Sequence, residues 1–374
     1  MTGRGLADRI AFGDLTDRIA AVLLRAGCST EVARILAGNC AACERDGTLS
    51  HGVFRIPGYL ASLNAGWVDG TAEPGLESAG PSFLRIDARN GFAQPAMAAA
   101  SATVSNMLAE TGVALVALRD SHHFSALWPD VEPWAERGFV ALTAVTGGPA
   151  VMPFGARERL FGTNPIAFAA PVAGRAPLVF DFATARMSQG DVRLALRAGR
   201  RVPPDTGLDA DGAPTDDPAR VLDGGGILPF GGHKGAALSL MVEILASAFT
   251  GGPFGHEVDW STHPGAEMPR TVQFFLIADP ERGQGRRFSA RIAGLLDVMK
   301  RAGATRLPGE HRHSQRAAAE SAGIPVSDEM RRVLVARLIE RAGAMGEDPR
   351  WASARRAVLD GTVDPWAATD ALID

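Results

Sequence analysis

The sequence predicts an α/β fold of the α+β kind, in which helices flank a sheet that is not built from repeated β-α units. Helical patterns of apolar residues cover 14–27, 30–46 and 94–111. Between 147 and 230 the apolar runs are short and glycine and proline recur, which indicates strands joined by irregular loops. No G-x-G-x-x-G follows a strand near the N-terminus, so the Rossmann fingerprint is missing.

Length and composition fit a soluble globular protein with one elaborate domain or two. The chain has 374 residues, of which 46% are hydrophobic and 21% charged. A net charge of −4 argues against a nucleic-acid partner, and no polybasic run points to a membrane. Residues 1–20 carry charges where a signal peptide needs an apolar segment. We therefore expect a cytoplasmic protein.

Two of the three cysteines, Cys40 and Cys43, match the pattern C-x-x-C. They lie inside the helical pattern of 30–46, and no second pair completes a zinc site. We expect them to be reduced, buried residues on one helical face, and we expect no metal site.

The first part of the chain predicts three helices. The helix at 14–27 stops at Gly27, and Thr30 is expected to cap the next one. Ser50 is expected to cap a third helix that runs through Arg55 and ends at Pro57.

The remaining elements follow from runs of apolar residues and from the turn residues between them. Helices are expected at 94–111, 126–137, 235–250, 286–302 and 327–345, with one or two more at 349–374. Strands are expected at 113–118, 139–146, 166–170, 178–182, 227–230 and 272–278. Turns and loops are expected at 64–81, 119–123 and 203–218.

One candidate site is the stretch Ser50-His51-Gly52-Val53-Phe54-Arg55. Arg55 follows His51 by four positions, so one helical turn would point both side chains at one small anion. Imidazole can donate and recover a proton near neutral pH, and guanidinium binds a carboxylate with two hydrogen bonds. The alternative is that His51 is a structural histidine.

A second candidate site is Gly231-Gly232-His233-Lys234-Gly235, at the start of the apolar helix expected from 235. Helix N-termini bind phosphate, and lysine is rare here, with only Lys234 and Lys300 among 38 basic residues. A P-loop is excluded because Gly232-His233 replaces its Lys-Ser/Thr. Together the two sites suggest a nicotinamide-dependent reductase of a small acid, although Lys234 could simply extend from a helix end.

Other polar residues are weaker candidates. His122-His123 follows a buried strand and is expected in a ligand-contacting loop, since no acidic or cysteine partner lies at metal-ligand spacing. Asp181 lies where an expected strand ends, and Asp191 follows Gly190. Each could be a ligand-binding acid or a solvated loop carboxylate. His311-Arg312-His313 is expected to be an exposed basic turn that could contact a phosphate.

Several motifs, in order, resemble the non-Rossmann (type-2) malate/L-lactate dehydrogenase family over roughly residues 10–330. They are Ser50-His51-Gly52, Gly162-Thr163-Asn164-Pro165-Ile166-Ala167-Phe168, Asp181-Phe182-Ala183-Thr184, Gly190-Asp191, Asp209-Ala210-Asp211-Gly212, Pro229-Phe230-Gly231-Gly232-His233-Lys234-Gly235 and Pro308-Gly309-Glu310. The resemblance implies a non-Rossmann NAD(P)-binding fold with a mixed, largely antiparallel sheet and flanking helices.

Two further stretches are most similar to the Δ1-piperideine-2-carboxylate/Δ1-pyrroline-2-carboxylate reductases of that family. They are residues 122–133, His-His-Phe-Ser-Ala-Leu-Trp-Pro-Asp-Val-Glu-Pro, and 258–266, Val-Asp-Trp-Ser-Thr-His-Pro-Gly-Ala. This implies a homodimer that uses NADPH, with NADH as the alternative cofactor, to reduce a cyclic imino acid to L-pipecolate or L-proline. The alternatives are a malate/lactate-type dehydrogenase of 2-hydroxy acids with the same groups, and a non-catalytic ligand-binding relative.

The resemblance also implies residue roles. Ser50, His51 and Asp191 would be catalytic, with His51 the proton donor, and Arg55 and Thr163 would bind the substrate. The cofactor would contact His122, His123, Phe124, Ser125, Ala126, Leu178, Asp181, Phe182, Ala183, Thr184, His233, Lys234, Arg306, Pro308, Gly309, Glu310 and Arg312.

The chain departs from the family pattern at two places near the expected pocket. It has Thr146-Gly147-Gly148 where the pattern has Asn-Ser-Met, and Ala185-Arg186 where it has Ser-Ala. We expect a cofactor-binding and catalytic core at 81–284, and a discontinuous helical part for substrate binding and dimerisation at 1–80 and 285–374.

Overall fold

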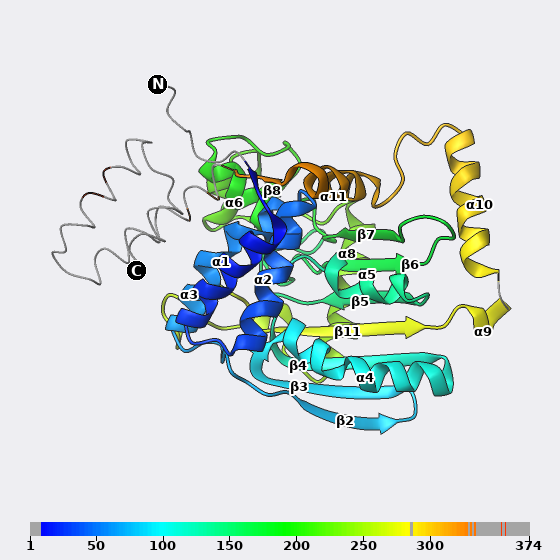
Figure 1. Ribbon diagram of the computed structural model, residues 1–374. Helices are drawn as coiled ribbons and strands as arrows, with labels where there is room; N and C mark the ends of the chain where they lie inside the picture. Colours follow the sequence, from blue (N-terminus) through cyan, green and yellow to red (C-terminus); the bar gives the residue numbers. More distant parts are fainter. Residues whose placement is uncertain are drawn as a thin grey trace, which may run out of the picture.

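The computed structural model describes residues 9–284 and 287–327, together with Met330, Val333, Ser353 and Arg356. A seven-stranded sheet with helices on both faces forms its centre (Figure 1). The strand order is β2-β3-β4-β11-β5-β6-β7, and every neighbouring pair is antiparallel except β3 and β4. The mixed, largely antiparallel sheet expected from the sequence is thus confirmed. The strands are β2 Gly75–Gly80, β3 Phe83–Phe92, β4 Val113–His122, β5 Val140–Val145, β6 Ile166–Ala170, β7 Leu178–Phe182 and β11 Thr271–Ala278.

Helices and short strands surround this sheet. The α-helices are α1 Phe12–Arg25, α2 Thr30–Arg45, α3 Ile56–Asn64, α4 Ala93–Thr111, α5 Trp128–Glu136, α6 Gln189–Arg197, α7 Pro218–Leu222, α8 His233–Val242, α9 Glu281–Gln284, α10 Phe288–Arg301 and α11 Glu310–Ala322. Short helical turns are η1 Leu49–His51, η2 Val53–Arg55, the π-helical η3 Glu243–Ala248 and η4 Gly255–Glu257. Two small sheets pair β1 Arg9–Ile10 with β12 Ile324–Pro325, and β8 Gly207–Leu208 with both β9 Pro214–Thr215 and β10 Gly226–Ile227.

The two faces of the central sheet pack against different helices. Successive side chains of a strand point to opposite faces, so Phe275 and Ile277 of β11 pack with α4 and α5. Phe274, on the same strand, packs with Val242 and Ala246 of α8 and η3. The main core therefore lies between the sheet and α4 and α5.

The two ends of the described chain meet. Residues from α1, α2 and α3 share one hydrophobic cluster with Ala319, Ile324 and Met330, and β1 pairs with β12. Arg316 of α11 adds an ion pair to Asp46 and another to Glu132, each at 2.6 Å. Both carboxylates are buried, and removing one partner of such a pair typically costs about 3–5 kcal/mol. These contacts support the expected discontinuous helical part, which stays a prediction.

Most expected elements are confirmed within a few residues. The strands at 166–170 and 178–182 have the expected bounds, and the helix at 94–111 ends at Gly112, whose φ is +81°. Cys40 and Cys43 are fully buried in α2, as expected. The helices expected at 327–345 and 349–374 lie outside the described residues, apart from isolated positions.

The expectations around the first two caps were wrong. Ser29, not Thr30, caps α2, and its Oγ accepts a hydrogen bond from the Val32 N–H at 3.3 Å. No single helix runs from Ser50 to Pro57. The stretch forms the turns η1 and η2 on either side of Gly52, whose ψ of −134° interrupts the helical path. Pro57 lies in the first turn of α3, where its missing N–H costs nothing.

Several expected loops contain regular structure. β2 lies within 64–81, and residues 119–122 belong to β4, because pairing with β3 and β11 outweighs their polar side chains. The strand β3 was not expected at all. The loop at 203–218 contains β8 and β9, and only Gly226–Ile227 pairs in the run expected at 227–230. His311-Arg312-His313 is the first turn of α11, not a free turn.

Candidate active site

The turn Ser50–Arg55 forms a compact, hydrogen-bonded unit. Ser50 Oγ lies 3.0 Å from His51 Nδ1, and Arg55 Nε donates to the Ser50 carbonyl at 2.8 Å. Gly52 permits this shape, because a Cβ there would lie 2.2 Å from Glu44 Oε1. That same oxygen accepts the Val53 N–H at 2.7 Å. The imidazole and the guanidinium are therefore held together without a bound ligand.

The Arg55 guanidinium lies over an aromatic ring and beside a glycine. It is 4.2 Å from the centre of the Phe124 ring, and a Cβ on Gly190 would approach its Nη2 to 2.7 Å. Burial lowers the pKa of Arg55 to about 10, with a further decrease from Arg193 that Asp191 opposes. Arg55 therefore stays cationic at neutral pH and can bind a carboxylate.

His51 is neutral near pH 7. Burial lowers the pKa of its imidazole well below the usual 6.5, and the nearby Arg55 and His123 lower it further. A carboxylate bound to Arg55 would offset one of these positive charges. Anion binding is thus expected to raise the pKa of His51, which couples binding to proton uptake.

The adjacent histidines of the expected ligand loop have different surroundings. His123 Nε2 lies 2.8 Å from Asp130 Oδ2, which also accepts a hydrogen bond from Gln273 Nε2 at 2.8 Å. His122 contacts Asn90 Oδ1 at 2.9 Å and the Pro269 carbonyl at 3.2 Å. Burial lowers the pKa of His122 to about 3.

His123 thus belongs to the His51 side of the site, whereas His122 is packed among structural partners. Trp67 lies edge-on to the His122 ring, 5.6 Å between ring centres. Ser125 also has buried partners, with its Oγ donating to Asn39 Oδ1, and Ala126 is buried in the main core.

Asp191 lies in the first turn of α6, close enough to Arg55 for its charge to act on the guanidinium. Ser188 caps this helix: its Oγ accepts the Asp191 N–H at 3.0 Å and donates to Asp191 Oδ2 at 2.8 Å. The Thr163 carbonyl accepts hydrogen bonds from Thr184, and the place of Thr163 in the substrate pocket stays a prediction. The structure therefore brings together Ser50, His51, Arg55 and Asp191.

The segments expected to contact the cofactor converge on β7, an edge strand of the central sheet. Asp181 Oδ2 accepts the N–H groups of Leu127 and Trp128 at 2.7 and 3.0 Å, which ties β7 to the start of α5. The Thr184 carbonyl accepts the Phe230 N–H at 3.1 Å, and the Val179 carbonyl accepts from Arg312 at 3.3 Å. The segments 123–128, 230–234 and 309–312 therefore flank one strand.

Within this group some side chains already have protein partners. The Asp181 carboxylate accepts a hydrogen bond from the first residue of α5, and Thr184 Oγ1 donates to the Thr163 and Asn164 carbonyls. Glu310 pairs with Lys300 at 2.8 Å. Leu178 and Ala183 pack in small hydrophobic clusters, and Gly309 adopts a φ of +85° before α11. Phe182, His233, Lys234, Arg306 and Pro308 are exposed. Arg312 lies over the Trp128 ring, and its Nη1 is buried without a hydrogen bond among the described residues.

The start of α8 has the features of a phosphate site. The helix begins at His233, two residues earlier than expected, so Lys234 lies in its first turn. Gly231 and Gly232 have φ of +57° and +62°, and no side chain caps the helix. A Cβ on Gly235 would lie 2.0 Å from the Phe230 carbonyl. This turn requires glycine and leaves N–H groups free for an anion.

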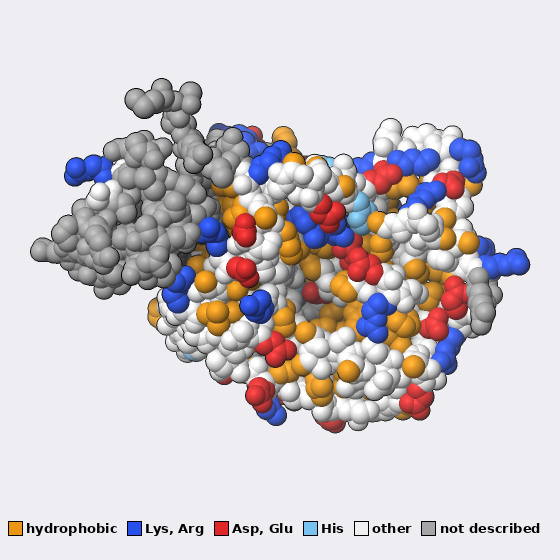
Figure 2. All heavy atoms as spheres, viewed as in Figure 1, with side chains coloured by type: hydrophobic (Ala, Val, Ile, Leu, Met, Phe, Trp, Pro, Cys, Tyr) orange, Lys and Arg blue, Asp and Glu red, His pale blue; other side chains and the backbone are white. Residues whose placement is uncertain are grey.

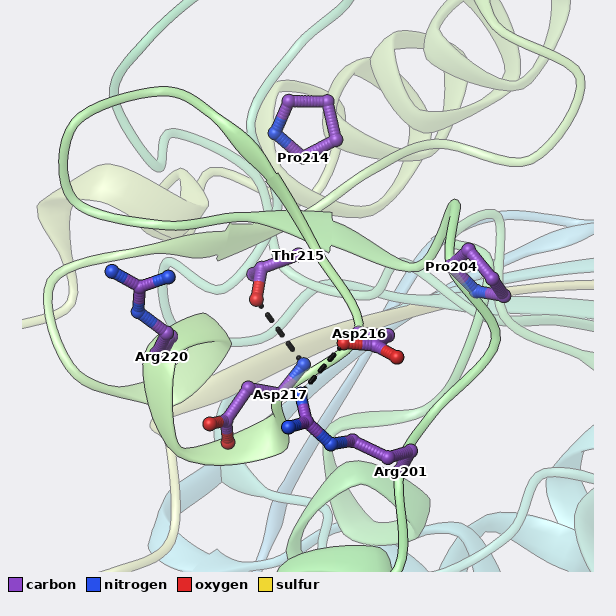
Figure 3. Close-up of a pocket in the computed structure, with 7 residues that line it drawn as sticks. All are labelled: Arg201, Pro204, Pro214, Thr215, Asp216, Asp217 and Arg220. Carbon is purple, nitrogen blue, oxygen red and sulfur yellow. Dashed lines mark hydrogen bonds and ion pairs between the residues drawn. The ribbon is translucent and has the colours of Figure 1, made fainter.

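A polar cavity of about 610 Å³ lies away from these residues, on the small three-stranded sheet and α7 (Figure 3). It is lined by Arg201, Pro204, Pro214, Thr215, Asp216, Asp217 and Arg220. Its charges are largely balanced, since Arg201 pairs with Asp216 at 2.7 Å and Arg220 lies 3.5 Å from Asp209. None of the expected site residues lines it, so the cavity carries no part of the candidate chemistry.

The departure at 146–148 has a packing reason. A Cβ on Gly148 would lie 2.1 Å from Cη2 of Trp260, so this indole occupies the space of a side chain. Trp260 Nε1 donates to the Met268 carbonyl at 2.7 Å. The departure at 185–186 places Arg186 in an ion pair with Asp205.

Three residues near the site were not expected from the sequence. Asp130 pairs with His123, and Arg193 lies 3.9 Å from Glu267 beside the Arg55 group. Arg193 follows Asp191 by two residues on α6, and this closeness in sequence to a candidate acid is a weak indication that Arg193 lies near the site. Asp130 follows its partner His123 by seven residues. No local pattern marks Glu267, because its partner Arg193 lies 74 positions away in the sequence.

An imidazole beside a guanidinium, together with a helix N-terminus suited to phosphate, defines an oxidoreductase built on a fold other than the Rossmann fold. The sequence model described as malate/L-lactate dehydrogenase matches residues 10–335. The chain belongs to this family.

Relatives within the family carry more specific names. The chain is 52% identical over 321 residues to the Δ1-pyrroline-2-carboxylate/Δ1-piperideine-2-carboxylate reductase of Pseudomonas putida, over 86% of this chain and 94% of that protein. The crystal structure of Δ1-piperideine-2-carboxylate reductase from Pseudomonas syringae pv. tomato has a TM-score of 0.85 and 51% identity, over 87% of this chain and 99% of that one. The NADP⁺-dependent (2R)-3-sulfolactate dehydrogenase of Chromohalobacter salexigens is 39% identical, over 79% of this chain and 89% of that protein.

Along the described chain, no helix is long and apolar enough to cross a membrane. No group of three or more histidine, cysteine or acidic side chains suited to a metal ion occurs in the same part.

Proposed function

We propose that the protein reduces the cyclic imino acids Δ1-piperideine-2-carboxylate and Δ1-pyrroline-2-carboxylate to L-pipecolate and L-proline, with NADPH as the reductant. The observation that carries the proposal is the fixed Ser50-His51-Arg55 unit, with its cationic guanidinium and neutral imidazole. The names of the relatives with about 50% identity support the choice of substrate.

Arg55 binds the substrate carboxylate. Its Nε is used by the Ser50 carbonyl, which leaves the outer nitrogens for the acid. The Phe124 ring under the guanidinium helps to hold it in position. The carboxylate contact in turn positions the imine carbon.

His51 gives a proton to the imine nitrogen. The bound carboxylate raises the pKa of the imidazole by offsetting the charge of Arg55, so the ring can hold the proton that the reaction needs. Ser50 Oγ, 3.0 Å from Nδ1, orients the imidazole. Asp191, whose negative charge acts on Arg55, is the third catalytic residue of the proposal.

The residues around β7 and the start of α8 fit a dinucleotide. Lys234 and the free N–H groups of the first turn of α8 would hold a phosphate, and the buried, unpaired Nη1 of Arg312 offers another donor. The cofactor, when bound, supplies the hydride. The NADP⁺ in the name of the sulfolactate dehydrogenase supports NADPH over NADH.

The alternative function is a malate/lactate-type dehydrogenase of 2-hydroxy acids. Arg55 and His51 would then act on a 2-oxo acid, with His51 protonating the carbonyl oxygen. The sulfolactate dehydrogenase relative favours keeping this alternative. Comparing kcat/KM for Δ1-piperideine-2-carboxylate, Δ1-pyrroline-2-carboxylate, pyruvate and oxaloacetate decides between them.

We expect the imino acids to be preferred. A 2-oxo acid preferred by tenfold or more would contradict the proposal, and binding of NADPH without turnover of any of the four acids would indicate a ligand-binding relative.

The protein forms a homodimer through the outer side of α8 and η3. Leu240, Met241, Ile244 and Phe249 are 38–51% exposed along this helix, which makes a continuous apolar stripe. The neighbouring sheet face adds partly exposed Leu115, Leu142, Phe168 and Leu276. An apolar face of this kind suits a second copy of the chain.

Light scattering tests the interface. Ile244→Arg is expected to give monomers, whereas Leu295→Arg, on the exposed side of α10, is expected to leave the dimer intact. The reverse result would move the interface to α10.

The cytoplasm is the proposed compartment. Cys28, Cys40 and Cys43 are free and buried, as in proteins of reducing compartments.

A further inference from the structure

Arg193 and Glu267 form an ion pair beside Arg55 that the proposed reaction does not use. Arg193 Nη1 lies 3.9 Å from Glu267 Oε2, and the two side chains are 37% and 47% exposed. Arg193 lies on α6, two residues after Asp191. The pair therefore lies at the edge of the candidate site and remains open to solvent.

Glu267 reaches the same wall of the site as the substrate clamp. A Cβ on Gly58 would lie 2.6 Å from Cε1 of Phe124 and 3.2 Å from Oε2 of Glu267. The face of that Phe124 ring carries the Arg55 guanidinium. The carboxylate of Glu267 therefore lies near the edge of the ring whose face carries Arg55.

The backbone that carries Glu267 is held firmly. Ser62 Oγ accepts the N–H groups of Glu267 and Met268, each at 3.0 Å. The Met268 carbonyl accepts the indole N–H groups of Trp67 and Trp260, at 2.8 and 2.7 Å. Four hydrogen bonds therefore hold the backbone of these two residues, so the Glu267 side chain starts from a fixed point of the site wall.

Substrates in this family differ in the number of acidic groups. Sulfolactate, the substrate named for one relative, carries a sulfonate besides its carboxylate, whereas cyclic imino acids carry one carboxylate. A second acidic group needs a second cation. Arg193 lies where it could serve, but Glu267 balances its charge and adds a negative charge of its own.

We propose that Glu267, held against Arg193, restricts the site to acids with a single anionic group. This inference rests on the proposed function in one respect, the binding of the substrate carboxylate to Arg55. Glu267 is then a specificity residue that acts by repulsion and by occupying Arg193.

Pyruvate and oxaloacetate test this directly, because they share the reacting ketone and differ by one carboxylate. Glu267→Gln keeps the size of the side chain, and the Ser62 hydrogen bonds are made by the backbone. With NADPH as cofactor, the ratio of kcat/KM for oxaloacetate to that for pyruvate is expected to rise about tenfold or more. Adding Arg193→Gln to this variant is expected to reverse the gain.

A ratio within twofold of the wild-type value would overturn the inference, and so would a failure of Glu267→Gln to turn over oxaloacetate at all. Glu77→Gln is the matched control, because Glu77 forms an exposed ion pair with Arg85 at 2.9 Å on β2 and β3. An equal gain in this control would assign the effect to net charge and also overturn the inference.

The two-acid comparison is independent of the imino acids. A shifted ratio in a protein that does not reduce cyclic imines would reject the proposed function and leave the role of Glu267 standing. Reduction of cyclic imines, with the same ratio of kcat/KM for oxaloacetate to pyruvate in Glu267→Gln as in the wild type, would support the proposed function and reject the role of Glu267.

Discussion

The two halves of the candidate site differ in how far the protein organises them without ligand. Around His51, Ser50 and Arg55 are hydrogen-bonded to one another, and burial together with the charge of Arg55 lowers the pKa of His51. Lys234, by contrast, is exposed, and within the described ranges it has no hydrogen-bonding or ion-pair partner. Seen from the same side as in Figure 1, the surface of the molecule has acidic and basic side chains around a central hollow with a largely hydrophobic floor (Figure 2).

The tasks proposed for the two halves account for this difference. Proton transfer needs atoms in fixed positions, so the protein supplies the packing and hydrogen bonds in advance. A phosphate brings its own charge and acceptors, so an open helix N-terminus with a mobile lysine is sufficient. Variants in the first half should therefore change turnover or substrate binding, and variants in the second half should change cofactor binding.

The largest expected effect is on turnover in His51→Ala. Removing the imidazole removes the proton donor, so kcat should fall by about 10²–10⁴-fold. The dissociation constant of NADPH, measured by its fluorescence, should change little because the proposed role of His51 is proton transfer and not cofactor binding. Unchanged kcat would remove His51 from the chemistry, and an equally large loss of NADPH binding would erase the distinction between the two halves.

Lys234→Ala is expected to produce the opposite pattern. Losing a charged hydrogen bond to phosphate should weaken NADPH binding by about 1.5–3 kcal/mol, with little effect on the stability of the cofactor-free protein. Fluorescence titration measures both proteins side by side. Arg85→Ala, which removes an exposed cation of β3, provides the control for net charge. Equal dissociation constants for wild type and Lys234→Ala would place the phosphate elsewhere.

The buried His122 is expected to make the stability of the folded protein depend on pH. Its pKa is about 3 in the folded protein and about 6.5 in an unfolded chain, so the unfolded state binds more protons between these values. Stability is therefore lost as pH falls below about 6.5, by about 2 kcal/mol between pH 7 and pH 5 from this group alone. The lowered pKa of His51 acts in the same direction.

Chemical denaturation at both pH values measures this loss. In His122→Gln the loss between pH 7 and pH 5 should be smaller by about the same 2 kcal/mol, whatever the stability of the variant at pH 7. An identical loss in both proteins would show that His122 is protonated in the folded state.

The smallest expected effect is on KM in Arg55→Lys. The ammonium keeps the charge but not the planar fork, so KM for the acid should rise on the order of tenfold with kcat less affected. Steady-state kinetics with the preferred acid measures both constants. A kcat reduced as much as in His51→Ala would mean that Arg55 acts in proton transfer as well as in binding.

The amino-acid sequence by itself determined the local elements and the identity of the reactive groups. Apolar periodicity located α1, α2, α4, β6 and β7, because these elements bury side chains at a regular spacing. The motif at Ser50-His51 and the glycines before Lys234 indicated both halves of the candidate site, since tight turns and helix ends require particular residues.

Only the tertiary structure decided which distant groups meet. Residues 119–122 became strand because two neighbouring strands pair with them, against their polar composition. His122 and His123 have equal claims in the sequence, yet Asn90 and Trp67 enclose the first while Asp130 orients the second. Glu267 reaches Arg193 across 74 positions of sequence. Such pairs depend on how the sheet and helices pack, and no local pattern encodes them because each partner's own neighbours are unremarkable in sequence.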